Sequence, residues 1–242
     1  MTCVKRRSVD DGRVKSIADL VNHSEPGMAL VRSWIAEAKN RVEELRCSTA
    51  DGERALLTLQ VTTFSPLGAL AFESGGLLVD GGWLRILGAG CPRLPRALDV
   101  WNQFEGTAAR RFPGTLLVGD DVLGGFFAMN GNAFPAPMGR VFYLAPDTLD
   151  WQDLELGYSE WLHWAFVGDL ARFYDGSRWP GWEGDVAALP GDRGISVFPF
   201  LWAKGPPVAE RQRRPVPLEE LWNLHAIELP NQMTAGGSRV RR

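Results

Sequence analysis

The hydrophobic pattern changes character along the chain, and its first section is helical. Apolar residues recur there every three or four positions, at Met28, Val31, Ile35, Ala38, Val42 and Leu45. This spacing is typical of an amphipathic helix, and Ser24 and Pro26 are typical helix-start residues. We therefore predict a long helix over 25–46, with shorter helices over 16–22 and 51–60.

After Thr62, short apolar runs alternate with glycine doublets, which is typical of strands joined by tight turns. The pattern predicts strands at 67–72, 77–79 and 83–87, followed by a helix near 96–104. The clearest β region comes next. It is a meander of strands at 115–118, 125–129 and 140–144, joined by turns rich in Asp, Asn, Gly and Pro.

Helical spacing returns in the last third of the chain. It predicts helices over 154–174, 182–189 and 218–229, a strand near 195–202 and a basic, proline-rich connector over 204–217. Helices, then strands, then helices indicate an α+β fold, with a twisted, mostly antiparallel sheet and helices packed over it. We expect one globular domain over 15–229, a disordered extension over 1–14 and a flexible basic tail over 230–242.

Composition narrows the class of protein. Hydrophobic residues make up 45% of the chain and charged residues 23%, with 26 Lys and Arg against 29 Asp and Glu. These values exclude a disordered chain, and the net charge of −3 argues against direct binding to nucleic acid. No apolar run is long enough to cross a membrane. The three cysteines form no CxxC pair, which favours reduced thiols in a cytoplasmic protein.

Recognisable catalytic and cofactor motifs are missing from the sequence. There is no GxxxxGK phosphate loop and no GxSxG nucleophile turn, so we assign no catalytic residue and no cofactor. The three histidines are far apart, and we predict no metal site. His163 follows Glu160 by three residues, and such a Glu-x-x-His pair is half of a di-iron ligand set. The second Glu-x-x-His pair that the set needs is missing from the sequence.

Asp120 and Asp121 are the most informative acidic pair. Adjacent side chains on an extended strand point to opposite faces, although at a turn the two carboxylates can converge on one site. The simpler interpretation is that they shape a turn. Asp147 also stands at the end of a predicted strand.

Tryptophan is unusually abundant, with ten residues in 242. Half of them lie within 151–182, where Arg178, Trp179 and Trp182 belong to one predicted loop. Tryptophan favours cores with a polar edge, pockets and interfaces. Core packing accounts best for most of them, while Trp179 and Trp182 fit a core and a binding groove about equally well.

Several motifs resemble a bacterial family called domain of unknown function 2625. They include Gly76-Leu77-Leu78-Val79-Asp80, Gly82-Trp83-Leu84-Arg85-Ile86-Leu87-Gly88 and Phe198-Pro199-Phe200-Leu201-Trp202. The resemblance extends over about 15–228, and the family name implies no activity.

A weaker similarity, over 115–165, is to the SUKH superfamily. It rests on Leu116 to Asn130, Gly139 to Asp147 and the helix that begins at Tyr158. The resemblance implies a SUKH-like core with additions at both ends. Many SUKH members are immunity proteins, which bind and neutralise toxins without catalysis.

Two main functions fit these observations. The first is a non-catalytic, immunity-type protein that binds a basic toxin through an acidic and aromatic face made by Asp120, Asp121, Trp179 and Trp182. The second is an enzyme or sensor with an aromatic pocket for a sugar-like or nucleotide-like molecule. Asp121 is one of its polar groups, and its further candidate pocket residues are Asp147, His163 and Arg178. A homo-oligomeric scaffold is a third alternative. An enclosed pocket distinguishes the second function from the open face that the first requires.

Overall fold

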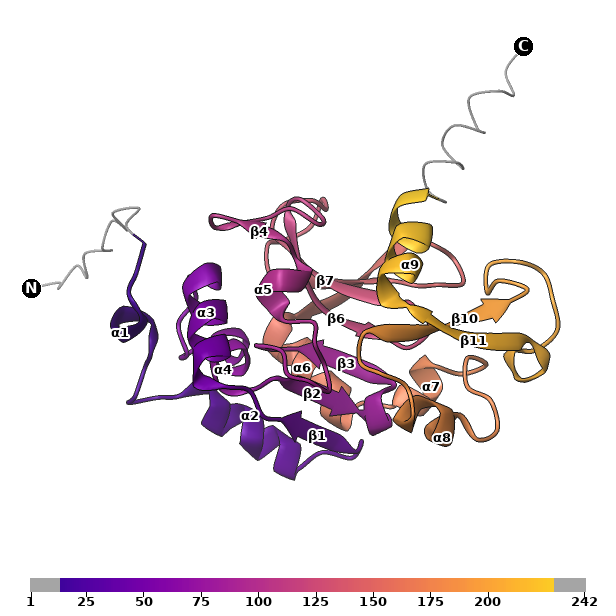
Figure 1. Cartoon of the computed structure of the whole chain (residues 1–242), viewed down its shortest axis with the longest axis horizontal. Helices are drawn as coiled ribbons and strands as arrows, with labels where there is room; N and C mark the ends of the chain where they lie inside the picture. The colour runs from indigo at the N-terminus through magenta and orange to yellow at the C-terminus, as the bar shows by residue number, and fades with distance from the viewer. Residues whose placement is uncertain (1–13, 229–242) are drawn as a thin grey trace, which may run out of the picture.

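A seven-stranded antiparallel sheet runs through the centre of the protein (Figure 1). The computed structural model describes residues 14–228. Neighbouring strands follow the order β1-β2-β3-β6-β7-β8-β9. Their bounds are β1 Val42–Leu45, β2 Gly76–Val79, β3 Leu84–Leu87, β6 Thr115–Asp121, β7 Phe126–Asn130, β8 Arg140–Leu144 and β9 Trp151–Gly157. Together with the helices around it, this sheet confirms the predicted α+β fold class.

Helices precede, interrupt and follow the sheet. They are α1 Ile17–Leu20, α2 Gly27–Ala36, α3 Thr49–Leu59, α4 Pro66–Glu73, α5 Leu98–Trp101, α6 Tyr158–Val167, α7 Leu170–Phe173, α8 Trp182–Ala187 and α9 Leu218–Trp222. Shorter helical turns are η1 Asp80–Gly82, η2 Val208–Glu210 and η3 Asn223–Glu228. Two small strand pairs lie outside the main sheet, β4 Phe104–Glu105 with β5 Ala108–Ala109 and β10 Arg193–Phe198 with β11 Gln212–Pro217.

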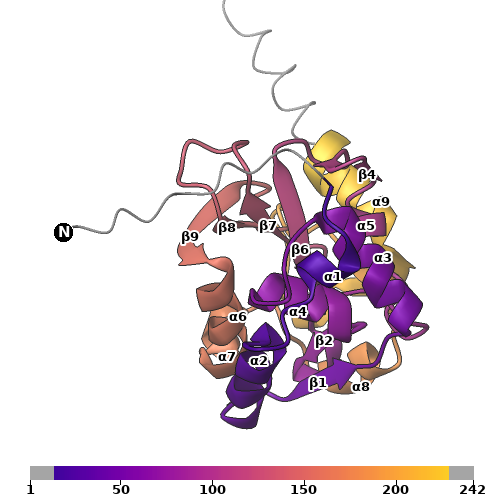
Figure 2. The same cartoon turned by 90° about the vertical axis from the view of Figure 1, so that its left-hand side faces the viewer.

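Helices cover both faces of the sheet. Consecutive residues of β7 point in opposite directions, so its two phenylalanines contact helices on opposite faces. The Phe127 ring lies 5.2 Å from the Trp161 ring of α6, and the Phe126 ring lies 5.0 Å from the Trp222 ring of α9. Both phenylalanines are fully buried. Figure 2 shows α6 and α7 on one side of the sheet and α5 and α9 on the other.

Two predictions for the first third of the chain are wrong. The helix predicted over 25–46 ends at Ala36, and 42–45 is strand β1, which pairs with β2. The run 67–72, predicted as a strand, belongs to helix α4. Its N-cap is Ser65, which accepts a hydrogen bond from the Gly68 N–H at 3.1 Å, and Pro66 is the first helical residue. These start signals outweigh the short apolar run.

Two predictions for the last third also need correction. The helix predicted over 154–174 begins only at Tyr158, because 151–157 is edge strand β9, paired with β8. The predicted connector over 204–217 contains strand β11. The helix at 182–189 is confirmed as α8. Apart from Val14, the segments 1–14 and 230–242 lie outside the described residues. In the described part of the chain, no helix is both long and apolar enough to cross a membrane.

Asp120 on β6 lies at the centre of a buried cluster of charges. Its carboxylate accepts a hydrogen bond from Arg85 Nε at 2.7 Å and further ones from Arg96 Nη1 at 2.5 Å and Nη2 at 3.1 Å. All three side chains are buried. The same guanidinium groups donate to backbone carbonyls beyond the sheet, Arg85 to Arg193 at 2.5 Å and Arg96 to Gly191 at 3.0 Å. The cluster therefore fastens the start of β10 to the main sheet.

Replacing Asp120 by Asn should cost much of the protein's stability, because two buried guanidinium groups lose their carboxylate. We expect Asp120→Asn to lower the free energy of unfolding by about 3–5 kcal/mol, measured by urea denaturation. The matched control is Glu105→Gln, which breaks the exposed pair with Arg110 and should cost at most about 1 kcal/mol. Equal losses in the two variants would contradict a structural role for the buried cluster.

Candidate functional site

Asp121 points to the opposite face of β6 from Asp120 and shapes the turn that follows. Its Oδ1 accepts hydrogen bonds from the N–H groups of Leu123 at 2.9 Å and Gly125 at 3.0 Å. Its Oδ2 accepts one from the Tyr143 hydroxyl at 2.7 Å. A Cβ on Gly125 would lie 2.2 Å from Asp121 Oδ2 and 2.4 Å from the Tyr143 hydroxyl, so the absence of a side chain there lets the two groups meet.

Burial dominates the electrostatics of this pair. It raises the pKa of Asp121 above the ordinary value of 3.8, and the hydrogen bonds from Tyr143, Gly125 and Leu123 oppose that rise. Burial and the nearby Asp121 raise the pKa of Tyr143 well above its ordinary value of 10.0. The Tyr143 hydroxyl therefore keeps its proton and donates a hydrogen bond to the Asp121 carboxylate.

A pocket of about 340 Å³ opens beside these groups, between β6, β8, α7 and the loop after β10. Asp121, Tyr143 and Tyr174 form its buried part. Asp147, Asp175, Gln152, Ser177 and Arg211 add polar groups, and the other lining residues are Leu123, Ala145, Pro146, Phe173, Gly176, Leu201 and Val208. We call this the Asp121 pocket.

The Tyr174 hydroxyl distinguishes this pocket from an ordinary surface cleft. Tyr174 is only 3% exposed, and its hydroxyl forms no hydrogen bond with any residue of the described chain. Burial and the charge of Asp121 both raise its pKa well above the ordinary value. Buried polar groups in folded proteins nearly always have a partner, so this exception makes the pocket that Tyr174 lines the candidate site.

Tyr174 also belongs to an aromatic cluster centred on Trp83, in which Trp179 and Trp182 are the other members. Their ring centroids lie 5.1–5.7 Å from that of Trp83. The Arg178 guanidinium lies 5.0 Å from the Trp83 centroid and 4.3 Å from that of Trp182, and it donates a hydrogen bond to Asp80 at 2.7 Å. The cluster forms an aromatic wall against the Tyr174 ring.

The comparisons with known proteins identify the family. A family model described as protein of unknown function DUF2625 matches residues 17–221. The chain belongs to the DUF2625 family. It is 43% identical over 211 residues to YbfG, an uncharacterised protein of Escherichia coli (strain K12), and the match covers 87% of this chain and 95% of YbfG.

A second relative of this DUF2625 protein is an uncharacterised protein of Haemophilus influenzae. The two are 36% identical over 217 residues, which cover 89% of this chain and 95% of the relative. No solved structure gives a significant match. These matches confirm the family resemblance seen in the sequence, whereas the weaker similarity to the SUKH superfamily stays a prediction.

The structure does not form the acidic and aromatic face predicted for a protein partner. Asp120 and Asp121 are both fully buried and point to opposite faces of the sheet. Trp179 is also buried and donates its Nε1–H to Asp185 at 2.7 Å, and Trp182 is half-buried against Trp83. The predicted open surface does not form, because three of these four residues are held inside the DUF2625 fold.

Only some of the residues predicted to line a small-molecule pocket lie together in the structure. Asp147 lines the Asp121 pocket, so the structure brings two of the predicted polar groups together. Arg178 lies in the aromatic wall instead, and His163 lies outside the pocket, edge-on to Trp34 at 5.6 Å. Glu160 does not pair with His163, because its Oε2 accepts a hydrogen bond from the Gly157 N–H at 2.8 Å. Within residues 14–228, no group of three or more His, Cys, Asp or Glu side chains could hold a metal ion.

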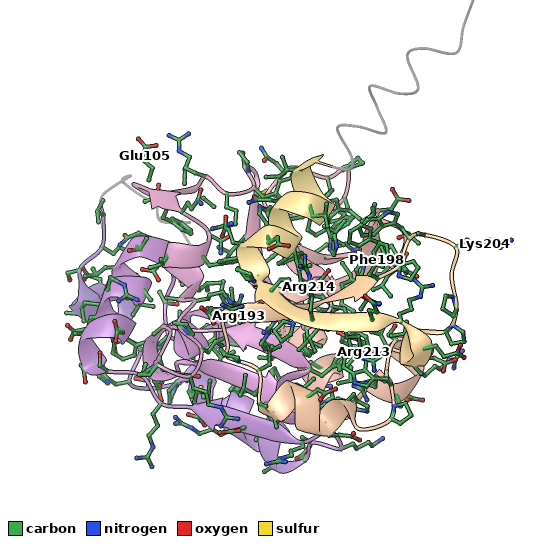
Figure 3. The ribbon with its side chains drawn as sticks, turned by 45° about the vertical axis from the view of Figure 1, so that its right-hand side comes forward. Glu105, Arg193, Phe198, Lys204, Arg213 and Arg214 are labelled. Atoms are coloured by element: carbon green, nitrogen blue, oxygen red, sulfur yellow. The ribbon has the colours of Figure 1, made fainter. Side chains whose placement is uncertain are left out.

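A second hollow, of about 560 Å³, lies between α8 and β11, where Trp179, Ile195, Arg213 and Arg214 are among the lining residues. Figure 3 shows Arg213 and Arg214 on the same strand, with Phe198 nearby. Arg213 donates to the carbonyls of Val208, Ala209 and Arg211, and its guanidinium lies 4.8 Å from the Trp179 centroid. This arginine therefore holds the chain before β11 in place.

The two tyrosines of the Asp121 pocket should differ in what they contribute to folding. Tyr143→Phe leaves a buried carboxylate oxygen without its donor, so we expect the free energy of unfolding to fall by about 1–3 kcal/mol. Tyr174→Phe removes a hydroxyl with no partner in the described chain, so stability should be unchanged or slightly higher. Urea denaturation of both variants measures the difference, and equal losses would contradict the assigned hydrogen bonds.

Proposed function

We propose that this DUF2625 protein binds a small polar molecule in the Asp121 pocket, as a receptor or sensor and not as a catalyst. The observation that carries the proposal is the Tyr174 hydroxyl, which is buried and lines the pocket without a partner among the described residues. A bound ligand would supply the missing hydrogen bond. The pocket volume of about 340 Å³ fits a small metabolite.

The arrangement of Asp121 supports binding over catalysis. Its two oxygens already accept three hydrogen bonds, which fix the carboxylate in one orientation. A general base has to take a proton from its substrate, and the three existing donors already occupy most of the lone pairs of this carboxylate. The same bonds make it a rigid, preorganised acceptor at the end of the pocket, which favours affinity.

A ligand that uses the Tyr174 hydroxyl should stabilise the wild-type protein against heat. In a thermal-shift screen of bacterial metabolites, we expect at least one to raise Tm. Its affinity for Tyr174→Phe should be about tenfold lower, because one hydrogen bond to a buried group is lost.

The matched control for this screen is Tyr158→Phe. Tyr158 is also buried with a hydroxyl that has no partner in the described part of the chain, but it lines neither the Asp121 pocket nor the other three hollows with the best-defined walls. Its removal should leave ligand affinity unchanged. The absence of any stabilising metabolite, or equal losses of affinity in the two variants, would contradict the proposed site.

A second candidate function is the stoichiometric binding of a protein partner, as expected for an immunity protein. Phe198 at the end of β10 favours it, because this side chain is 59% exposed and borders a hollow of about 300 Å³ with Phe200 and Arg214. Exposed aromatic residues beside arginine are typical anchors of protein interfaces. The arginines favour an acidic partner, whereas the buried aspartates leave a basic toxin without its predicted contact.

Substituting Phe198 tests this second function. We expect the wild-type protein to retain an acidic protein in stoichiometric amount from its native bacterial lysate, and Phe198→Ser to lose it, because the anchor is removed. Leu30→Ser is the matched control, since Leu30 is 47% exposed on α2. Mass spectrometry compares the three samples, and retention of the same proteins by all of them would argue against an interface at Phe198.

A further inference from the structure

The ionisable groups of the Asp121 pocket are mostly acidic. Three carboxylates line it, those of Asp121, Asp147 and Asp175, against the single cation of Arg211. Within the described residues, none of the three carboxylates forms an ion pair. The pocket therefore carries an excess of negative charge.

Arg211 is committed to holding the wall of the pocket. Its Nε donates to the Pro206 carbonyl at 2.7 Å, and its Nη1 donates to the carbonyls of Pro199 at 2.9 Å and Phe200 at 2.7 Å. These bonds orient the guanidinium toward the loop between β10 and β11. An anionic ligand would thus compete with backbone carbonyls for this arginine while facing three carboxylates.

The hydrogen-bonding groups of the pocket lead to the same conclusion. The Asp121 and Asp147 carboxylates can only accept when ionised, and the Tyr174 oxygen has free lone pairs. Aromatic rings stand beside them, with the Phe173 centroid 5.2 Å from that of Tyr143 and 4.8 Å from that of Tyr174. N–H donors that carry a positive charge match carboxylates, and the faces of aromatic rings attract cations.

We infer that the ligand of the Asp121 pocket is an organic cation, with an ammonium or guanidinium group directed at Asp121 and Tyr174 and flanked by Asp147. This inference rests on the proposed ligand-binding function and specifies its chemical class. A neutral polyol could use the same acceptors, but it would leave the negative charge uncompensated. A nucleotide would bring phosphates against three carboxylates.

Three probes of one shape separate these alternatives. Cyclohexylamine, cyclohexanol and cyclohexanecarboxylate share a ring and differ in charge at pH 7, and agmatine adds a guanidinium group. With calorimetric titration of the full chain, we expect both amines to bind at least about tenfold more tightly than the alcohol, and the carboxylate not to bind. Added salt should weaken the amines and leave the alcohol unaffected.

Variants of the carboxylates test whether the preference for a positively charged probe arises in the Asp121 pocket. Asp121→Asn should weaken amine binding about tenfold, and Asp147→Asn about two- to fivefold because Asp147 is exposed. Asp147→Asn keeps the test valid if Asp121→Asn does not fold. Asp150→Asn is the matched control, because Asp150 is an exposed carboxylate three residues away that does not line the pocket.

The outcomes separate the two levels of the proposal. Suppose that the alcohol binds as tightly as the amines, and that its binding is lost in Tyr174→Phe but kept in Asp147→Asn. This result would overturn the preference for a cation and leave the ligand-binding function standing. Amine binding that is the same in wild type, Asp121→Asn, Asp147→Asn and Asp150→Asn would overturn the assignment of the cation to this pocket. If none of the four probes binds and no metabolite stabilises the protein, both the cation and the proposed function fail.

Discussion

The rest of the structure depends on the burial of Asp120 between two arginines. Isolated charges are expensive to remove from water, so this carboxylate is tolerable only because Arg85 and Arg96 surround it. The same arginines reach the backbone of the segment before and at the start of β10, and the Ile195 N–H donates to the Val122 carbonyl at 2.6 Å. The β10–β11 pair is outside the main sheet, and these bonds attach it there. The loop that it carries supplies Leu201, Val208 and Arg211 to the Asp121 pocket.

Because side chains alternate along β6, Asp120 and Asp121 lie in different chemical environments. Asp120 faces the β10–β11 side, where two arginines neutralise it, and Asp121 faces α7, where Tyr143 donates a hydrogen bond to it. The two residues are chemically identical and adjacent, yet their environments differ completely. The negative charge of Asp120 is neutralised by Arg85 and Arg96. Burial raises the pKa of Asp121, and no cation among the described residues forms an ion pair with it. A buried carboxylate without a cationic partner, such as Asp121, is the kind of group that a positively charged ligand would stabilise.

Much of the fold could be predicted from the sequence, and the errors have physical reasons. The strands of the central meander were predicted because their apolar runs end in turn residues, and the family was recognised from long motifs. The 67–72 run was misassigned because the cap at Ser65 outweighs its apolar character. Strand β9 was missed because the helical spacing of residues 162–173 was extended back to Leu154. Pairing with β8 decides the outcome.

The site was harder to predict because it depends on tertiary contacts. The opposite directions of Asp120 and Asp121 follow from strand geometry, and Asp121 and Asp147 were both candidates. Tyr143 and Tyr174 were not, since nothing in the sequence brings residues of β8 and α7 to one carboxylate. The sequence contains one signal for Tyr143: Asp121 is followed by Gly124 and Gly125, and such a turn leaves room for a large side chain.

Several buried polar atoms lack a hydrogen-bond partner among the described residues, and this lowers the stability of the folded state. Three atoms of one aromatic cluster have no hydrogen-bond partner among residues 14–228: Trp83 Nε1, Arg178 Nε and the Tyr174 hydroxyl. The fold therefore accepts several unmet hydrogen bonds in one place. Each weakens the folded state, and the dense ring packing around Trp83 offsets that cost. Of the three residues only Tyr174 lines the Asp121 pocket. Under the proposed function, the cluster holds one polar group for the ligand, and the ring packing of its neighbours keeps that group in position before the ligand arrives.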